Sequence, residues 1–353
     1  MLKKVRAIAL ISRIISGIVS FIIIITAVFF FGAVYFNSAP RRLPAGLEDN
    51  SLIFEVRNGE SASSVGQRLE KAGVIRNRYF WTLLFRLDNE QIKTGTYKIA
   101  FPAAAMEIRG VLTGGEQLLV KVTVQEGVTL GKASRILEEA GICDARSFLA
   151  ASNSKVILDA YNIPGASMEG YLYPDTYLFP LNYPASKVVS AMADAFFRRL
   201  GEIAPEAIGI RSMSPAELNM RVIIASIVER EYRIGEEAPL IAGVFFNRIG
   251  IGMALQSCAT VEYVITEIQG KPHPEVLYNR DLEIKDPYNT YMQPGLPPGP
   301  ICSPGETALK AAFNPASSNY LYFRLIDEKA GRHYFSRTLD DHIRAGSFYL
   351  KGK

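Results

Sequence analysis

The chain has 353 residues, of which 48% are hydrophobic, and a formal net charge of +4, so it is long enough for two or three folding units. The first 42 residues contain six basic and no acidic residues, which leaves the rest of the chain close to neutral. This balance excludes the basic surface typical of nucleic-acid-binding proteins. Three cysteines exclude a disulfide-rich scaffold, and none of them has metal-ligand spacing, so we expect neither a metal nor an organic cofactor.

Residues 14–36 form an apolar segment of 23 residues without a charge. As a helix this segment is about 34 Å long, enough to cross a bilayer core of roughly 30 Å. It is too long for the apolar part of a cleaved signal peptide, so we predict an uncleaved single-pass transmembrane helix rather than a buried core helix. Residues 1–13 carry four basic side chains, and the positive-inside rule therefore predicts a cytoplasmic tail and an extracytoplasmic remainder.

A duplicated unit follows a predicted polar linker at residues 37–50. Residues 55–74 resemble residues 123–142 at a constant offset of 68 residues. Each copy predicts a strand, a glycine turn, a helix and a glycine stop. The four glycines are Gly59, Gly73, Gly127 and Gly141. Internal similarity of this kind indicates a duplicated structural unit.

The start of the first copy also resembles the opening of LysM modules, which bind chains of N-acetylglucosamine. A sugar-binding module and a structural spacer both remain open for this region. The chain is accordingly divided into a LysM-like α+β subdomain at residues 51–118, a second repeat with a connecting region at 119–205, and a C-terminal α+β domain at 206–353. The fold class predicted for the whole chain is α+β.

A buried helix that carries a carboxylate is the most informative segment of the C-terminal domain. Ser214, Pro215 and Glu217 form a capping box that predicts the start of the helix. Val222 lies on the same apolar stripe as Glu229, seven residues further on. Burial disfavours the charged form of a carboxyl and raises its pKa, so Glu229 is a candidate general acid. A structural ion pair with an arginine is the alternative interpretation of this residue.

Residues 286–305 form the second informative segment, because they hold six prolines and three glycines in 20 residues. A long loop inside a compact domain is typical of a functional segment. Aromatic, amide and hydroxyl groups on this loop suit a sugar ring and its N-acetyl substituent, and their residues are Tyr288, Asn289, Tyr291 and Gln293. A rigid structural loop is the alternative. Beyond it, residues 320–326 and 333–336 predict a β-hairpin, followed by a final helix after Thr338.

The sequence motifs of several other classes of enzyme are absent from this chain. The three histidines form no His-Glu-x-x-His pattern, and the sequence has no Gly-x-Ser-x-Gly elbow, P-loop or dinucleotide fingerprint. Acid catalysis by a carboxyl remains, and a glycosidic bond is a bond that such catalysis breaks.

Several motifs together resemble the MltG (YceG-like) family of endolytic murein transglycosylases. They run in order along the chain and occupy residues 169–177, 225–231, 244–248, 251–257, 288–291, 295–301, 304–305 and 309–312. The resemblance implies one membrane anchor, a LysM-like region and a catalytic domain. It aligns the catalytic glutamate of the family with Glu229. Glu231 lies about 200° further round the helix and is expected to point elsewhere.

The resemblance also suggests residues that contact the substrate and one departure from the family. Asn247, Gln256 and Thr290 join the four loop residues as candidate substrate-binding positions. Many relatives carry Asp where this chain has Cys258. A disulfide between Cys258 and Cys302 is therefore expected as one option, and free thiols are the other.

The function that the resemblance implies is cleavage of the bond between N-acetylmuramic acid and N-acetylglucosamine. Glu229 would protonate the glycosidic oxygen and then take the proton of the muramoyl C6 hydroxyl as it attacks C1, leaving a 1,6-anhydro end. The expected partners are peptidoglycan glycan strands, inner-membrane lipid around the anchor, and peptidoglycan synthases and division proteins. Cutting nascent strands would end their elongation. A non-catalytic peptidoglycan-binding or cell-division scaffold and a hydrolytic muramidase are the alternatives.

Overall fold

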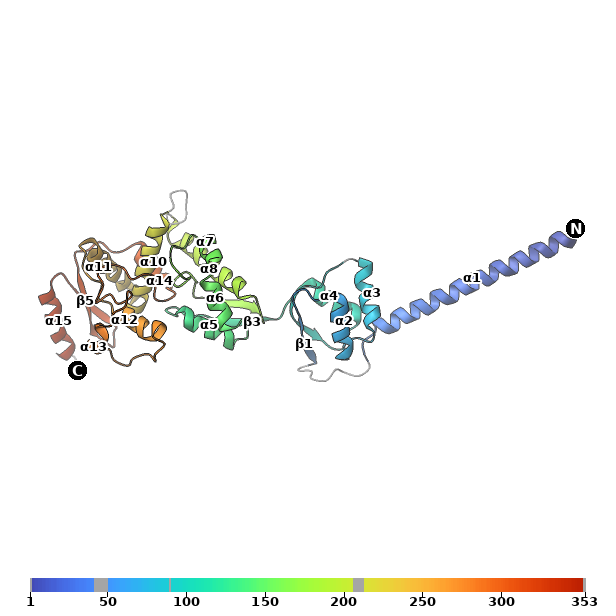
Figure 1. Cartoon of the computed structure of the whole chain (residues 1–353), viewed down its shortest axis with the longest axis horizontal. Helices are drawn as coiled ribbons and strands as arrows, with labels where there is room; N and C mark the ends of the chain where they lie inside the picture. Colours follow the sequence, from blue (N-terminus) through green and yellow to red (C-terminus); the bar gives the residue numbers. More distant parts are fainter. Residues whose placement is uncertain (1, 41–49, 89, 206–212, 352–353) are drawn as a thin grey trace. The chain divides into compact units, whose positions relative to one another are not determined.

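The computed structural model describes residues 2–40, 50–88, 90–205 and 213–351 (Figure 1). These residues form a mixed α+β protein with two compact units, Met1–Leu119 and Val120–Lys353. Most of the predicted linker at 37–50 and the start of the predicted domain at 206–353 lie outside the described residues.

The first unit begins with a long helix, α1 (Leu2–Asn37), drawn in dark blue in Figure 1. Its segment Arg13–Asn37 has a mean hydropathy of 2.8, and none of it is buried. It is the one helix in the described part of the chain that is long and apolar enough to cross a membrane. The helix begins before the predicted segment 14–36, because residues 2–13 contain no glycine or proline to stop it.

The remainder of the first unit is a small two-stranded sheet with helices packed on it. Its elements are β1 (Ser51–Val56), α2 (Ala62–Lys71), α3 (Arg78–Asp88), β2 (Gly95–Ala100) and α4 (Ala105–Gly114). β1 and β2 are antiparallel, with Phe54 opposite Tyr97. Leu69, Trp81 and Tyr97 are fully buried in the core of this unit.

The second copy of the repeat begins, like the first, with a strand, a glycine turn and a helix. It consists of β3 (Leu119–Thr123), α5 (Leu130–Glu139), α6 (Ala145–Ser152), α7 (Lys155–Ala160) and β4 (Thr176–Pro180), and β3 pairs with β4. The predicted turns and stops are confirmed, because all four glycines adopt the left-handed conformation. Their φ angles are 72° at Gly59, 73° at Gly73, 72° at Gly127 and 70° at Gly141. Side chains other than glycine rarely adopt these values, which explains the residue type.

The second unit continues with one helix after the repeat, α8 (Ala185–Ile203), and then with a mainly helical region. This region consists of α10 (Pro215–Glu231), the short helix η1 (Gly235–Glu237), α11 (Ala238–Gly250), α12 (Cys258–Tyr263), the π-helical turn η2 (Val264–Ile268), α13 (Asn279–Leu282) and α14 (Glu306–Phe313). It ends with β5 (Tyr322–Asp327), β6 (Arg332–Ser336) and α15 (Leu339–Lys351). β5 and β6 form the antiparallel hairpin that the sequence predicts.

A single apolar core runs through the whole second unit. Leu137 of α5, Phe196 of α8, Ile224 of α10 and Leu309 of α14 belong to the same cluster of buried side chains. The predicted division at residue 205 therefore does not separate two cores. The second copy of the repeat is packed onto the C-terminal region as part of one folding unit.

Candidate active site

α10 brings charged residues to the edge of the apolar core. Ser214 is its N-cap and accepts a hydrogen bond from the Glu217 backbone N–H at 3.2 Å, and Pro215 stands in the first turn, so the predicted start is confirmed. Seven consecutive residues, Val222–Val228, are buried. The last turn then emerges with Glu229, Arg230 and Glu231 in sequence, and these side chains leave the helix in different directions.

Glu229 faces an open groove at the end of the second repeat. The groove is lined by the turn at residues 123–126 and by residues 174–176. Glu229 Oε2 accepts a hydrogen bond from the Gly305 backbone N–H at 2.9 Å. Burial raises the pKa of this carboxyl to about 7, with a further contribution from the Glu126 charge, although the Gly305 hydrogen bond and Arg230 oppose the rise. Glu229 therefore retains its proton close to neutral pH.

Two further acidic residues, Glu126 and Asp175, line the same groove as Glu229. Glu126 lies directly against Gly305, where an added Cβ would sit 2.0 Å from its Oε1 atom. The backbone of the adjacent turn pairs with the loop before α14, since Gly127 N–H donates to Ser303 O at 2.9 Å. The second copy of the repeat thus builds one wall of the groove, which the sequence did not indicate.

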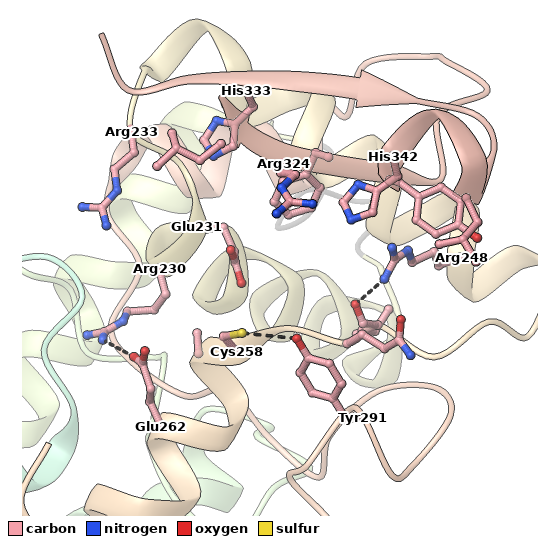
Figure 2. A pocket seen from close by; sticks show the side chains of 17 residues that line it. Arg230, Glu231, Arg233, Arg248, Cys258, Glu262, Tyr291, Arg324, His333 and His342 are labelled. Atoms are coloured by element: carbon pink, nitrogen blue, oxygen red, sulfur yellow. Dashed lines mark hydrogen bonds and ion pairs between the residues drawn. The ribbon is translucent and has the colours of Figure 1, made fainter. Parts of the chain in front are cut away.

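Glu231 faces a different cavity of about 510 Å³, which is drawn in Figure 2. Its direction agrees with the helical phase expected from the sequence. Ser257 Oγ donates a hydrogen bond to Glu231 Oε1 at 2.5 Å. Burial raises the pKa of the Glu231 carboxyl, and Glu262 adds to the rise, whereas Ser257, His333 and Arg230 oppose it.

The Glu231 cavity is also the place where two of the predicted sugar-binding residues meet. Gln256 and Tyr291 line it on the side of the proline-rich loop, together with Cys258. Figure 2 shows Glu231 pointing into the space between Cys258 and the hairpin residues Arg324 and His333. Neither Gln256 nor Tyr291 lines the groove of Glu229. The structure therefore combines the expected sugar-binding side chains with the other glutamate of the triplet.

A second carboxylate, that of Glu262 on α12, lines the same cavity. It forms an ion pair with Arg230 at 3.0 Å, and His273 Nε2 lies 3.4 Å from it. The opposite wall carries positive charge from Arg233, Arg248 and Arg324. Within the described residues, no group of three or more histidine, cysteine or acidic side chains could hold a metal ion.

Two further predicted positions, Asn289 and Thr290, hold the proline-rich loop in place. Asn289 is fully buried, and its Nδ2 donates to the backbone carbonyls of Leu282 and Ile284. The Thr290 hydroxyl accepts from the Ser257 N–H at 3.0 Å, which fixes the residue that holds Glu231. These contacts connect the proline-rich loop to the segment that precedes α12.

Three more predicted residues lie apart from both carboxylates of α10. Asn247 Nδ2 donates to the carbonyls of Ser318 and Tyr320 at 2.8 and 2.9 Å. The ring of Tyr288 packs against that of Tyr263, and Gln293 is exposed on the loop.

The disulfide expected as one option is not formed, because both cysteines are free. Cys258 Sγ lies 3.2 Å from the Tyr291 hydroxyl in the cavity. Cys302 is fully buried and donates to the backbone carbonyl of Ser226 at 3.2 Å. Free thiols, the other option, are what the structure contains, and the two thiols have separate partners.

The sequence analysis assigned the acid role to Glu229 through the resemblance to the family, and helical phase predicted only that Glu231 points elsewhere. Phase shows that two side chains diverge, but it does not show which of them faces a cavity. Arg248 was also missed. Its guanidinium donates to the carbonyls of Leu255 and Leu321 at 2.6 Å each and stacks on Tyr322, and so it ties the hairpin to the cavity wall. The signal that could have indicated Glu231 was its place two residues after Glu229 in the motif at residues 225–231.

Comparison with known proteins agrees with the YceG-like family that the sequence motifs resemble. The model of the YceG-like family matches residues 54–347. The crystal structure of a YceG-like protein from Listeria monocytogenes superimposes with a TM-score of 0.55 at 28% sequence identity, covering 84% of this chain and 99% of that one.

Two similar proteins carry the name endolytic murein transglycosylase. One, from Streptococcus pneumoniae serotype 2, is 27% identical over 329 residues, which cover 84% of this chain and 58% of that protein. The chain therefore spans less than two thirds of the length of this relative. The other, from Bacillus subtilis strain 168, is 26% identical over 317 residues and is covered to 84%, as is this chain. Because the family model matches most of its length, the chain belongs to the YceG-like family.

Proposed function

We propose that this protein is an endolytic lytic transglycosylase that cleaves peptidoglycan glycan strands between N-acetylmuramic acid and N-acetylglucosamine. Two similar proteins named endolytic murein transglycosylase support the proposal. The observation that carries it is a half-buried carboxyl, that of Glu231, in a cavity lined by amide and aromatic side chains that suit a sugar. A carboxyl with a raised pKa in such a cavity is suited to protonate a glycosidic oxygen.

Glu231 is our first candidate for the general acid, and Glu229 is the second. The argument for Glu231 is its shared cavity with Gln256 and Tyr291. Ser257 occupies Oε1 of the carboxyl, which leaves Oε2 as the oxygen that carries the catalytic proton. The argument for Glu229 is a pKa of about 7 in an open groove.

The reaction needs one carboxyl in two roles. The protonated acid donates its proton to the oxygen of the bond, and the N-acetylglucosamine chain leaves with that proton. The resulting carboxylate accepts the proton of the muramoyl C6 hydroxyl while the C6 oxygen bonds to C1. Because no water is added, the products are one ordinary chain end and one 1,6-anhydro end.

A hydrolytic muramidase is the competing function, and a specific observation favours it. Glu262 lines the cavity of Glu231, so a second carboxylate is available there to orient a water molecule. Glu262 also forms an ion pair with Arg230 at 3.0 Å. Hydrolysis would give reducing ends in place of anhydro ends.

Digestion of purified glycan strands, followed by mass spectrometry of the products, tests both assignments. We expect anhydro ends from the unaltered protein and a loss of at least about 100-fold in rate for Glu231→Gln, the usual contribution of a general acid. Glu229→Gln is the matched control on the same helical turn, and it is expected to keep the same products.

Each other outcome has a defined meaning. Loss of cleavage in Glu229→Gln alone would transfer the acid role to Glu229. Reducing ends that disappear in Glu262→Gln would make the protein a muramidase. Strand binding without any cleavage would leave the peptidoglycan-binding scaffold as the function.

The proposal includes the setting of the enzyme. We propose that α1 anchors the chain in the bacterial inner membrane with residues 1–13 in the cytoplasm, so that the site acts on nascent strands close to the bilayer. The apolar, unburied segment Arg13–Asn37 supports the anchor. A LysM-like sugar-binding role for the first unit, and contact with peptidoglycan synthases and division proteins, are proposals of the same standing.

A further inference from the structure

Helix α3 of the first unit exposes an apolar face. Tyr79, Leu83 and Leu87 are 70%, 48% and 71% exposed, and they recur every four residues. Side chains at this spacing lie along one face of a helix. The opposite face is buried through Trp81 and Phe85. α3 is therefore apolar on two sides, although only one of them faces the core of its own unit.

The exposed face of α3 begins at the end of α1. The ring of Phe80 lies 6.3 Å from that of Phe36, which stands in the last turn of α1. Leu83 and Leu87 follow Phe80 at spacings of three and seven residues, so they continue on the same side of α3. This stripe extends about 10 Å along α3 from the anchor.

Polar contacts attach the first unit to the end of α1. Arg76 donates to the carbonyls of Ser38 and Ala39 at 3.1 and 2.6 Å, and its guanidinium stacks on Tyr35. The Met106 N–H at the start of α4 donates to Asn37 Oδ1 at 2.9 Å. These contacts hold α3 directly beside the end of the apolar segment of α1.

The charges around the face are mainly positive. Arg78 and Arg86 project from α3 itself, and Arg78 has one acidic neighbour, Glu70, at 3.9 Å. At the far end of α3, Asp88 pairs with Arg109 at 2.8 Å. Within the described residues, Arg86 has no carboxylate within ion-pair distance. Arginines beside exposed leucines and a tyrosine are the composition of helices that lie at a membrane surface.

We propose that the face of α3 formed by Tyr79, Leu83 and Leu87 lies in the membrane–water interface on the extracytoplasmic side of the inner membrane and binds lipid beside the anchor. The inference depends on α1 being the membrane anchor of the proposed function. The apolar surface of α1 then continues into that of α3, so burial in the acyl boundary covers both. Tyr79 and the arginines take the headgroup level, where aromatic and basic side chains are enriched. The first unit would be held against the bilayer in one orientation.

Fluorescence quenching in vesicles tests this contact with the full-length chain. The variant Leu83→Trp is reconstituted into phosphatidylcholine vesicles that contain lipids brominated near the glycerol end of the acyl chain. We expect a blue-shifted emission that the brominated lipid quenches, and stronger quenching when phosphatidylglycerol is included. The native Trp81 is fully buried and gives a background that the unaltered protein measures.

Val156→Trp is the matched control, because Val156 is 79% exposed on α7 of the second unit. The emission of the added tryptophan should stay at the wavelength of a tryptophan in water, and the brominated lipid should not quench it. Emission of Leu83→Trp that is water-like, or blue-shifted but not quenched by bromine, would overturn the proposal; in the second case a protein surface covers the face.

Flotation and extraction with alkaline carbonate separate this proposal from the anchor itself. A chain that floats with the vesicles and resists extraction has an inserted α1, and the quenching result then decides on α3 alone. A chain that does not float has no anchor, and it overturns the lipid contact together with that part of the proposed function.

Discussion

At the scale of single residues, the site depends on how burial changes the pKa of two glutamates, Glu229 and Glu231, that are two positions apart. Both leave the end of a buried helix, and for both the loss of water around the carboxyl is the largest cause of a raised pKa. Their surroundings differ, because Glu229 receives a backbone hydrogen bond from Gly305 and Glu231 receives a hydroxyl hydrogen bond from Ser257. The same chemistry is therefore available on two faces of α10.

The raised pKa of Glu229 has a cost that can be measured. Its carboxyl has a pKa of about 7 in the folded state against an ordinary value of 4.5, so folding favours the protonated form. The contribution of this carboxyl to the free energy of unfolding is fully present below pH 4.5. It is lost as the pH rises towards 7, by on the order of 3 kcal/mol. Glu229→Gln removes this titration. We expect its stability relative to the unaltered protein to rise between pH 4 and pH 8, as measured by denaturant unfolding.

A stability difference between the two proteins that stays constant with pH would contradict this account. Glu306→Gln serves as the control, because the Glu306 side chain is 44% exposed and the pKa of its carboxyl is lowered by its contact with Lys310. This variant keeps the titration of Glu229, so its stability relative to the unaltered protein should not rise over the same interval.

At the scale of elements, the cavity is made by contacts that join α11 to the hairpin and the loop. Asn247 and Arg248 are neighbours near the end of α11, and together they donate hydrogen bonds to the carbonyls of five residues: Ala254, Leu255, Ser318, Tyr320 and Leu321. The segment after α14 carries no regular structure at residues 314–321, so side-chain donors satisfy its backbone acceptors.

Asn247→Ala distinguishes a supporting role from contact with the substrate. The contacts with Ser318 and Tyr320 predict that this change lowers the free energy of unfolding by about 1–3 kcal/mol, because two partly buried acceptors lose their donor. Thermal unfolding measures that loss. A variant with unchanged stability and a raised KM for glycan strands would instead assign Asn247 to the substrate.

At the scale of the whole molecule, the two copies of the repeat belong to different apolar cores. The first copy has a core of its own, whereas the second contributes Leu137 to the core that also contains α10 and α14. The same local sequence pattern thus supports a separate unit in one place and part of the site's framework in the other.

The pair Leu69 and Leu137 tests this difference, because the two residues are equivalent in the repeat and both are fully buried. Each change to alanine should cost about 2–5 kcal/mol in its own unit. We expect two calorimetric transitions in the full chain. Leu137→Ala should lower the one at which glycan cleavage is lost, and Leu69→Ala should lower the other. A single transition shifted equally by both variants would contradict the division into two units.

Local signals in the sequence accounted for much of the fold. The apolar run of α1, the N-cap at Ser214, the four glycines of the repeat and the hairpin were all predicted, because each depends on residues within one or two turns of chain. The division of the core was not predictable in this way. It depends on which apolar faces meet, and both copies of the repeat have the same faces.

The sequence by itself determined that the chain carries an apolar helix, a repeat and a carboxylate-bearing buried helix of the YceG-like family. Only the tertiary structure decided which carboxylate shares a cavity with Gln256 and Tyr291, and whether Cys258 and Cys302 meet. The reason is physical. A helix of known phase gives the direction of Glu229 relative to Glu231, whereas a cavity is formed by side chains from segments up to about a hundred residues away, whose positions follow from packing.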